Sequence, residues 1–298
     1  MRLTLPLLLS CVLLPSHATD WQAFHWQMGS LQGGPVERLG VVLPVTIDGI
    51  DCYAQLDTGA NGGVIWHAQP DATQAPAAAE ARKVLVEIAG ARAYASAEPA
   101  ILARLTTALC KQTVIASLGN AFFEQGTLTL DLGGARLAYA PQALLANDRS
   151  AQPLFYARWT GTGGHPLVEV AQHGRAPGYA LLDTGATRFG LTATRAEEWA
   201  ALTGNAPLQA SDKVRKYSVK SWGREVDCYE TGAAGDFIVG AVAVGAVTAA
   251  YCVNQGFDAP VRLIGVLGLK PLRDRVITID YRSRRWKLAE SATSDRSE

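Results

Sequence analysis

Two aspartates lie in nearly identical surroundings in this chain. Residues 53–60 read YAQLDTGA and residues 179–186 read YALLDTGA, so the two octets differ at a single position. A lone Asp-Thr-Gly tripeptide occurs by chance in many proteins, whereas a repeated octet indicates the duplication of a structural unit. Asp57 and Asp183, the fifth residue of each octet, are therefore the candidate catalytic pair.

Two carboxyl groups in such a repeat can carry out acid–base chemistry. If approximate two-fold symmetry relates the octets, Asp57 and Asp183 face each other, and like charges that close share one proton over a wide pH range. One carboxylate then accepts a proton from water while the other donates to a carbonyl oxygen. This chemistry requires no metal and no covalent nucleophile, and we expect no cofactor.

The neighbours of the aspartates support this interpretation. Gly59 and Gly185 allow a sharp turn and a close approach, and their N–H groups can bond to the carboxylates. Thr58 and Thr184 carry hydroxyls that could bond across the symmetry axis and lock the two loops together. These four residues are predicted to support the active-site loops.

Strands are expected to position both octets. Leu39–Ile47 and Ile50–Leu56 form a predicted hairpin around the turn Asp48-Gly49. The pair Leu167–Val170 and Tyr179–Leu182 repeats this arrangement in the second half. Each returning strand ends at its aspartate, which places the carboxyl group on a loop.

A second repeat follows each octet in the same order. Residues 118–140 align without a gap onto residues 267–289, and each segment begins with Leu-Gly. The glycines, Gly119 and Gly268, would leave room beneath each loop for the chain to pass. Two repeats in one order predict two equivalent lobes.

The domain organisation follows from the repeats. We predict a signal peptide at 1–18, an N-terminal lobe at 19–150, a C-terminal lobe at 151–290 and a disordered tail at 291–298, with the linker inside 142–164. Charged residues make up only 18% of the chain and glycines number 29, which favours a turn-rich β protein. A short helix is expected over 194–202, and 237–253 is expected to form two strands joined at Gly245.

The doubled Asp-Thr-Gly-Ala, with Ser117-Leu118-Gly119 and Val266-Leu267-Gly268 following, resembles the pepsin/retropepsin superfamily of aspartic peptidases. The resemblance covers nearly all of the mature chain. It implies an all-β, bilobal pepsin-like fold with few short helices, two pseudo-symmetric barrel-like lobes and a cleft between them that binds an extended peptide. It also implies that Asp57 and Asp183 are catalytic, and that the chain is a fused pair of retropepsin-like units acting as a monomer.

The chain departs from the family in two respects. It has no Tyr-Gly-Thr-Gly flap, so the hairpins predicted at Val84–Tyr94 and Lys216–Val226 are flap candidates by position only, with Gly90 and Tyr94 as the candidate flap residues. Ala60 and Ala186 replace the Ser or Thr usual in pepsins, which predicts a working pH nearer neutral.

The chain begins like an exported protein. Arg2 precedes an apolar stretch too short to span a bilayer, and Ser16-His17-Ala18 fits a cleavage site after Ala18. The alternative is a lipobox ending at Cys11, which would anchor the protein through a lipid. The expected location is periplasmic or secreted.

Four cysteines remain after cleavage: Cys52, Cys110, Cys228 and Cys252. An even number in an oxidising compartment favours two disulfides, for which three connectivities exist. The simplest keeps each bridge within one half, as Cys52–Cys110 and Cys228–Cys252. Four free buried thiols are the alternative.

Composition limits the partners. A net charge of zero gives no electrostatic reason to bind nucleic acid. The histidines and cysteines lack metal-ligand spacing. A peptide or protein substrate is expected, and the alternatives are aspartates that only stabilise turns, a peptide-binding or inhibitor protein on the same fold, and a protease with a single target.

Overall fold

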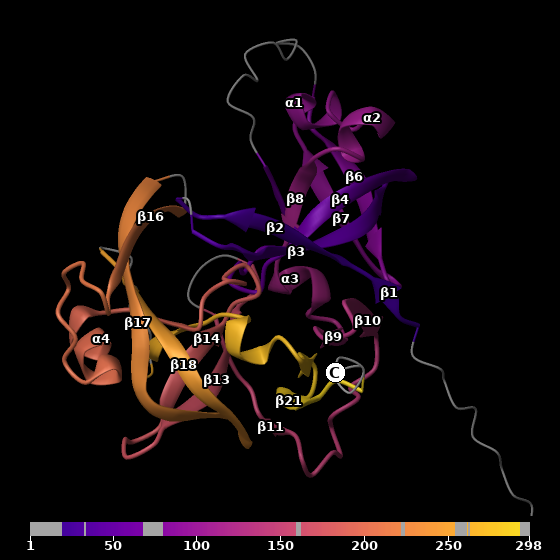
Figure 1. Ribbon diagram of the computed structural model, residues 1–298. Coiled ribbons are helices and arrows are strands. Elements are labelled where there is room, and N and C mark those ends of the chain that lie inside the picture. The colour runs from indigo at the N-terminus through magenta and orange to yellow at the C-terminus, as the bar shows by residue number, and fades with distance from the viewer. Residues whose placement is uncertain are drawn as a thin grey trace, which may run out of the picture.

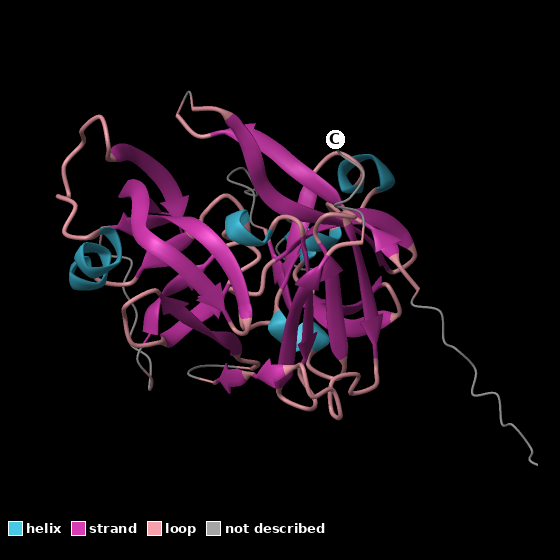
Figure 2. Cartoon of the chain, turned by 60° about the horizontal axis from the view of Figure 1, so that its bottom comes forward, coloured by secondary structure: helices cyan, strands magenta, loops and turns pink. Residues whose placement is uncertain are grey.

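The computed structural model describes residues 20–32, 34–67, 80–158, 162–221, 224–253, 261 and 263–292. The predicted signal peptide with Cys11 lies outside these residues, as do the turn Trp222-Gly223 and residues 293–298 of the predicted tail. The described chain is all-β and bilobal, and its strands form three sheets (Figures 1 and 2).

The first sheet belongs to the N-terminal half. Its strand order is β5-β8-β4-β3-β6-β7, and β2 pairs with β3. These strands are β2 (His25–Ser30), β3 (Val36–Ile47), β4 (Ile50–Leu56), β5 (Val64–Trp66), β6 (Arg82–Ile88), β7 (Ala91–Ala97) and β8 (Val114–Leu118).

The second sheet belongs to the C-terminal half. Its order is β12-β13-β14-β19-β15-β18-β17-β16, with an additional pairing of β13 with β17. These strands are β12 (Phe155–Ala157), β13 (His165–Gln172), β14 (Gly178–Leu182), β15 (Leu191–Ala193), β16 (Arg215–Ser221), β17 (Arg224–Val239), β18 (Val242–Cys252) and β19 (Leu263–Leu267).

The third sheet is shared by both halves, in the order β1-β10-β9-β20-β21-β11. Thr129 of β9 lies opposite Thr278 of β20, and the flanking pairs are arranged symmetrically around them. The two copies of the predicted second repeat therefore pair with each other at the centre of this sheet. Its strands are β1 (Gln22–Ala23), β9 (Thr127–Asp131), β10 (Arg136–Ala140), β11 (Gln152–Pro153), β20 (Arg275–Asp280) and β21 (Arg285–Glu290).

The helices in the described residues are short and lie at the edges of the sheets (Figure 2). The longest, α4, confirms the helix expected near 194–202 and ends at Gly204, whose left-handed φ of 67° suits glycine. None is long and apolar enough to cross a bilayer. They are α1 (Pro99–Leu102), α2 (Thr107–Cys110), α3 (Asn120–Phe123), α4 (Ala196–Thr203) and the 3₁₀ turn η1 (Lys270–Leu272).

The predicted hairpins that lead to the aspartates are present. In β4 the apolar side chains at Cys52, Ala54 and Leu56 are buried while their neighbours are more exposed, the period of a strand with one face in the core. The turn Asp48-Gly49 has positive φ at both residues, as a two-residue hairpin turn requires.

Two sequence-based expectations about strand positions are wrong. The predicted linker contains β11 and β12, which occupy the same places in the second half as β1 and β2 in the first. The strands expected to join at Gly245 instead join after Val239, because Gly240 makes the turn, while Gly245 lies within β18 at a positive φ of 71° opposite Phe237. Gly245 therefore accompanies a shift in the strand register, as glycines inside strands commonly do at β-bulges.

The described disulfides follow the connectivity within each half. Cys52–Cys110 joins β4 to α2, and Cys228–Cys252 joins the neighbouring strands β17 and β18. The main hydrophobic core extends through all three sheets and includes the fully buried Leu43, Leu130 and Leu182. Ser291, assigned to the tail by sequence, is buried, and its hydroxyl donates to Asp131 over 2.6 Å.

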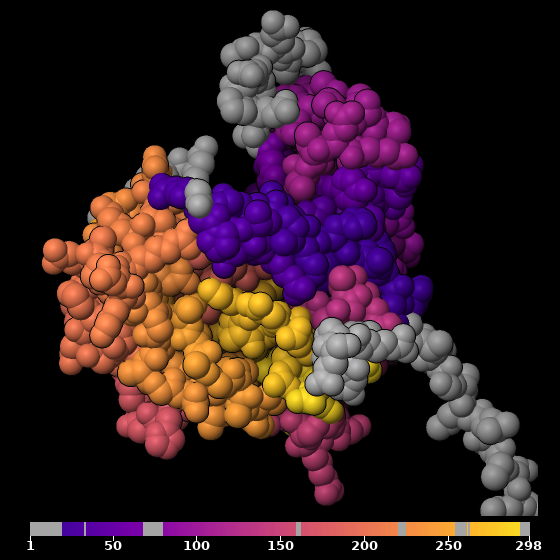
Figure 3. Space-filling model, viewed as in Figure 1, coloured from indigo at the N-terminus to yellow at the C-terminus, as the bar shows by residue number. Residues whose placement is uncertain are grey.

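The two halves also hold each other through hairpins. The outer part of the β2–β3 hairpin, residues 26–38, which we call the N-terminal arm, crosses to the C-terminal half (Figure 3). There the Arg215 guanidinium donates to the Leu31 carbonyl over 3.1 Å. In return, the β12–β13 hairpin reaches the N-terminal half, where Arg158 pairs with Glu124 at 2.6 Å.

Candidate active site

Equivalent strands deliver the two aspartates. Asp57 follows β4, which runs parallel to β8, and Asp183 follows β14, which runs parallel to β19. The Asp57 N–H donates to the Leu118 carbonyl over 3.0 Å, and the Asp183 N–H donates to the Leu267 carbonyl over 2.9 Å. The second repeat is thus the segment against which each aspartate loop is held.

Two threonines tie the loops together with four buried hydrogen bonds. The Thr58 N–H donates to the Thr184 hydroxyl over 2.9 Å, and the Thr184 N–H donates to the Thr58 hydroxyl over 3.0 Å. Each hydroxyl donates onward across the axis, to the carbonyl of Leu182 over 2.7 Å and of Leu56 over 3.1 Å. Because both threonines are completely buried, these bonds determine how far apart the aspartates lie.

The loop glycines allow the carboxyl groups to approach. A Cβ at Gly59 would lie 2.5 Å from the carboxyl carbon of Asp183, and one at Gly185 would lie 2.8 Å from a carboxyl oxygen of Asp57. Each glycine therefore makes room for the carboxyl group of the opposite loop. The Gly185 N–H also donates to its own Asp183 over 2.7 Å.

The glycines of the second repeat are needed for a different close contact. A Cβ at Gly119 would lie 2.4 Å from the Gly62 carbonyl oxygen, and one at Gly268 would lie 2.2 Å from that of Ala186. The chain passes beneath each aspartate loop at these points. The close backbone approach predicted at these two glycines is therefore present in both halves.

The two carboxyl groups form one acid–base unit. Burial raises the pKa of both, and the nearby Asp57 charge raises the pKa of Asp183 further, to about 8. The Asp183 carboxyl donates a hydrogen bond to Asp57, which also accepts N–H groups from Gly59 and Ala60. Asp183 is thus the protonated member and Asp57 the ionised one. Both residues are partly exposed to solvent, although their carboxyl groups are largely enclosed by the loops.

Asn120 supports the first loop and was not identified from the sequence. It is fully buried, and its amide donates to the carbonyls of Thr58 over 2.7 Å and Ala60 over 2.8 Å. The Tyr281 hydroxyl donates to its side-chain oxygen over 2.9 Å. The only signal in the sequence is position, because Asn120 directly follows the Leu-Gly that begins the second repeat.

The second loop is supported differently. Leu269 occupies the place of Asn120, and the Thr187 hydroxyl donates instead to the Thr184 carbonyl over 2.8 Å. Two histidines also lie near the first loop. The His165 ring hydrogen-bonds the Gly59 backbone, and His67 lies close enough to Asp57 for each charge to affect the pKa of the other.

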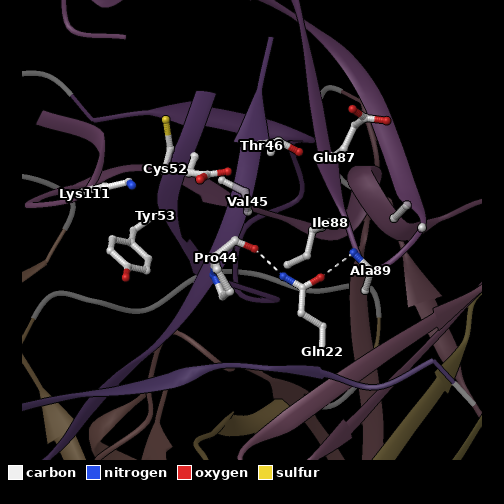
Figure 4. Close-up of a pocket in the computed structure, with 13 residues that line it drawn as sticks. Gln22, Pro44, Val45, Thr46, Cys52, Tyr53, Glu87, Ile88, Ala89 and Lys111 are labelled. Atoms are coloured by element: carbon white, nitrogen blue, oxygen red, sulfur yellow. Dashed lines mark hydrogen bonds between the residues drawn. The ribbon is translucent and has the colours of Figure 1, made fainter. Parts of the chain in front are cut away.

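The candidate flap residues, Gly90 and Tyr94, both belong to the β6–β7 hairpin. Gly90 is in the β6–β7 turn, beside a recess of about 700 Å³ that none of the aspartate-loop residues line (Figure 4). Gln22 lines this recess, accepting from the Ala89 N–H over 2.8 Å and donating to the Pro44 carbonyl over 2.5 Å. Tyr94 is 72% exposed in the edge strand β7. This hairpin is thus held against β1 and β3 at Gln22.

The second hairpin that the sequence offered as a flap candidate, Lys216–Val226, is formed by β16 and β17. It follows β15 and α4 in the chain, and its described base contacts the N-terminal arm, where the Ser218 N–H donates to the Gln32 side chain over 3.0 Å. Its turn lies outside the described residues. Among the described residues, no three His, Cys, Asp or Glu side chains form a metal-ligand cluster.

No protein-family model matches this chain, and no curated protein is significantly similar to it. The function therefore has to be inferred from the site itself.

Proposed function

We propose that the protein is an aspartic endopeptidase in which Asp57 and Asp183 share one proton and activate a water molecule. The supporting observation is the hydrogen bond between the two carboxyl groups, both with raised pKa, on loops that Thr58 and Thr184 lock together. A pair of aspartates that only stabilised turns would not need a shared proton or glycines that admit the opposite carboxyl.

The proposed reaction assigns a role to each carboxyl. Asp57, the ionised member, accepts a proton from water as the water oxygen attacks the peptide carbonyl carbon. Asp183 donates its proton to the carbonyl oxygen, which gives a tetrahedral diol. Asp57 then returns its proton to the amide nitrogen as the C–N bond breaks, and the diol gives a proton back to Asp183.

One chain supplies both carboxyl groups, so we propose a monomer that binds an extended peptide or protein segment between the lobes. We also propose export, to the periplasm or beyond. Two disulfides are stable in an oxidising compartment, and the first 18 residues read as a signal peptide. Mass spectrometry of the natural protein should find an N-terminus just after Ala18, whereas a lipid on Cys11 would contradict simple cleavage.

The test is incubation of the mature protein with a peptide library between pH 3 and 8.5. We expect cleavage that a pepstatin-type inhibitor blocks and that Asp57→Asn abolishes. The rate should rise above the ordinary aspartate pKa, as Asp57 ionises, and fall near pH 8 as the shared proton is lost. A folded protein without cleavage throughout this range would favour the peptide-binding or inhibitor alternative.

A further inference from the structure

A recess of about 250 Å³ lies between the N-terminal arm and the C-terminal half. Trp26 and Arg38 line it from the arm, Arg188 from the loop that follows Asp183, and Lys270 and Arg273 from η1 and its end. Figure 3 shows the indigo arm lying directly above the yellow segment that contains η1. We call this feature the Arg38 recess.

The walls of the Arg38 recess carry more positive than negative charge. Four cations line it (Arg38, Arg188, Lys270 and Arg273), and Glu37 is the one anion among the lining residues. Two further carboxylates lie close by, Glu230 behind Arg188 and Asp274 near Arg38. Even with both included, the cluster keeps a net positive charge.

The carboxylates are engaged mainly by Arg188. Its side chain is only 3% exposed and pairs with Glu37 at 3.0 Å and Glu230 at 2.8 Å. Lys270 lies 3.8 Å from Glu37 and 3.7 Å from Glu230. Glu37 and Glu230 are therefore both engaged by Arg188 and Lys270.

Arg38 is positioned by an aromatic ring, and one of its guanidinium nitrogens has no acceptor among the described residues. Its guanidinium stacks 4.4 Å from the centre of the Trp26 ring, and its Nη1 is buried with no hydrogen-bond partner in the described part of the chain. Burial and the neighbouring Arg273 charge lower the pKa of Arg38 by more than the Asp274 charge raises it, so the positive charge is only partly compensated there. The Nη1 of Arg188 is likewise buried and unpartnered among the described residues.

We propose that the Arg38 recess binds a carboxylate group, with Arg38 as the main contact and Arg273 and Lys270 at its rim. A carboxylate accepts two parallel hydrogen bonds from a guanidinium, and it would separate two like charges that face each other. Trp26 and Leu269 supply an apolar wall for the carbon chain that carries it.

The carboxylate can come from an acidic side chain of a bound peptide or from a small free carboxylate. The first source rests on the proposed peptidase function. It is geometrically reasonable because Thr187 and Arg188, which line the recess, belong to the loop that carries Asp183. An acidic residue on one side of the scissile bond would then reach the recess.

Direct binding of citrate at low salt tests the site without using catalysis. Calorimetry on wild type should show binding that 0.5 M salt weakens and that Arg38→Gln reduces about tenfold, as expected for a charge-assisted bond. The matched control is Arg284→Gln. Arg284 also stacks on an aromatic ring, 4.4 Å from the centre of Tyr156, and it does not line the recess.

A matched pair of peptides, one with Glu and one with Gln at each position around the cleavage site, tests the peptide source. Binding is measured on Asp57→Asn and cleavage on wild type. Preference for Glu at one position, lost in Arg38→Gln and retained in Arg284→Gln, identifies the substrate as the source. Citrate binding without this preference identifies a free carboxylate.

The two proposals fail separately. If the peptides are cleaved but neither citrate binding nor the Glu preference depends on Arg38, the recess is not a carboxylate site and the peptidase function stands. If Glu peptides bind through Arg38 but none is cleaved, the recess proposal stands and the peptidase proposal is wrong. Equal citrate binding by wild type and Arg38→Gln, with no Glu preference, overturns the inference.

Discussion

The two halves of the molecule have equivalent strand pairings and loop contacts at the aspartates and differ farther from them. Both have a hairpin that ends at an Asp-Thr-Gly-Ala loop, a parallel partner strand and a glycine beneath the loop. Beyond this, β17 and β18 of the C-terminal half span 16 and 11 residues, whereas β6 and β7 of the described N-terminal half span 7 residues each. The symmetric part lets the two carboxyl groups share one proton. The unequal parts give the two sides of the proposed substrate cleft different surroundings.

The supports under the loops show the same division. Asn120 with Tyr281 holds the first loop, and Thr187 holds the second. Electrostatics differ as well, since Asp183 has the higher pKa of the two carboxyls. An approximately symmetric pair can therefore have fixed and different roles. Five experiments test whether the two halves differ in this way.

Replacing either carboxyl should have the largest effect. Asp57→Asn and Asp183→Asn are each expected to lower kcat/KM by at least about 10²–10⁴-fold, because either change removes one partner of the proton exchange. The measurement is peptide cleavage at pH 6 with circular dichroism to confirm folding. Substantial activity in either variant would mean that the two halves do not act as one unit.

The threonine interlock should matter equally in both halves. Thr58→Val and Thr184→Val each leave a buried N–H and a buried carbonyl without a partner, so each should cost about 2–5 kcal/mol of unfolding free energy. Urea unfolding measures the loss. The Ser variants retain the hydroxyl and serve as controls, and a large difference between the two Val variants would contradict the symmetry of the interlock.

The loop supports should not be interchangeable. Asn120→Leu, which copies the residue at the equivalent place in the other half, leaves the Thr58 carbonyl and the Tyr281 hydroxyl unsatisfied and should cost about 2–4 kcal/mol. The Ala60 carbonyl keeps the backbone N–H of residue 120 as its donor. Tyr281→Phe, the matched control, removes one bond and should cost about 1 kcal/mol. A neutral Asn120→Leu in urea unfolding would show that the first loop needs no such support.

The pH dependence of stability should differ between the two carboxyls. Since the folded-state pKa of Asp183 is raised, the folded state holds the extra proton and loses stability as pH rises from about 4 to 8. Asp183→Asn removes this loss, so its melting temperature should exceed that of wild type by roughly 2–4 °C at pH 8 and by less at pH 4. Scanning calorimetry at both pH values tests this, with Asp57→Asn expected to gain less.

The two hairpins should differ in their effect on activity. Tyr94→Ala, on the exposed edge of the N-terminal half, is expected to leave kcat/KM within about twofold and stability within about 0.5 kcal/mol, since surface substitutions usually do. Peptide kinetics test this prediction. A large rise in KM would restore the β6–β7 hairpin as a flap and would make the halves more alike than they are here.

Much of the local structure could be predicted from the sequence. The strands before each aspartate, the turn at Asp48-Gly49, the helix near residue 200 and the within-half disulfides follow from periodicity, turn chemistry and cysteine number. The turn predicted at Gly245 was wrong, because glycine is common both at turns and at bulges. Only the pairing of Gly245 with Phe237 shows that it lies within a strand. The strands β11 and β12 were missed because two or three residues carry no periodic signal.

The doubled octet by itself determined the candidate pair, Asp57 and Asp183, and the threonines and glycines that serve them, because identical short sequences on equivalent strands are placed equivalently by symmetry. Only the tertiary structure decided which carboxyl holds the proton, since that depends on burial and on the field of groups far away in the chain. The same holds for Asn120 and for the Arg38 recess. Their contacts join segments whose separation in sequence carries no pattern to read.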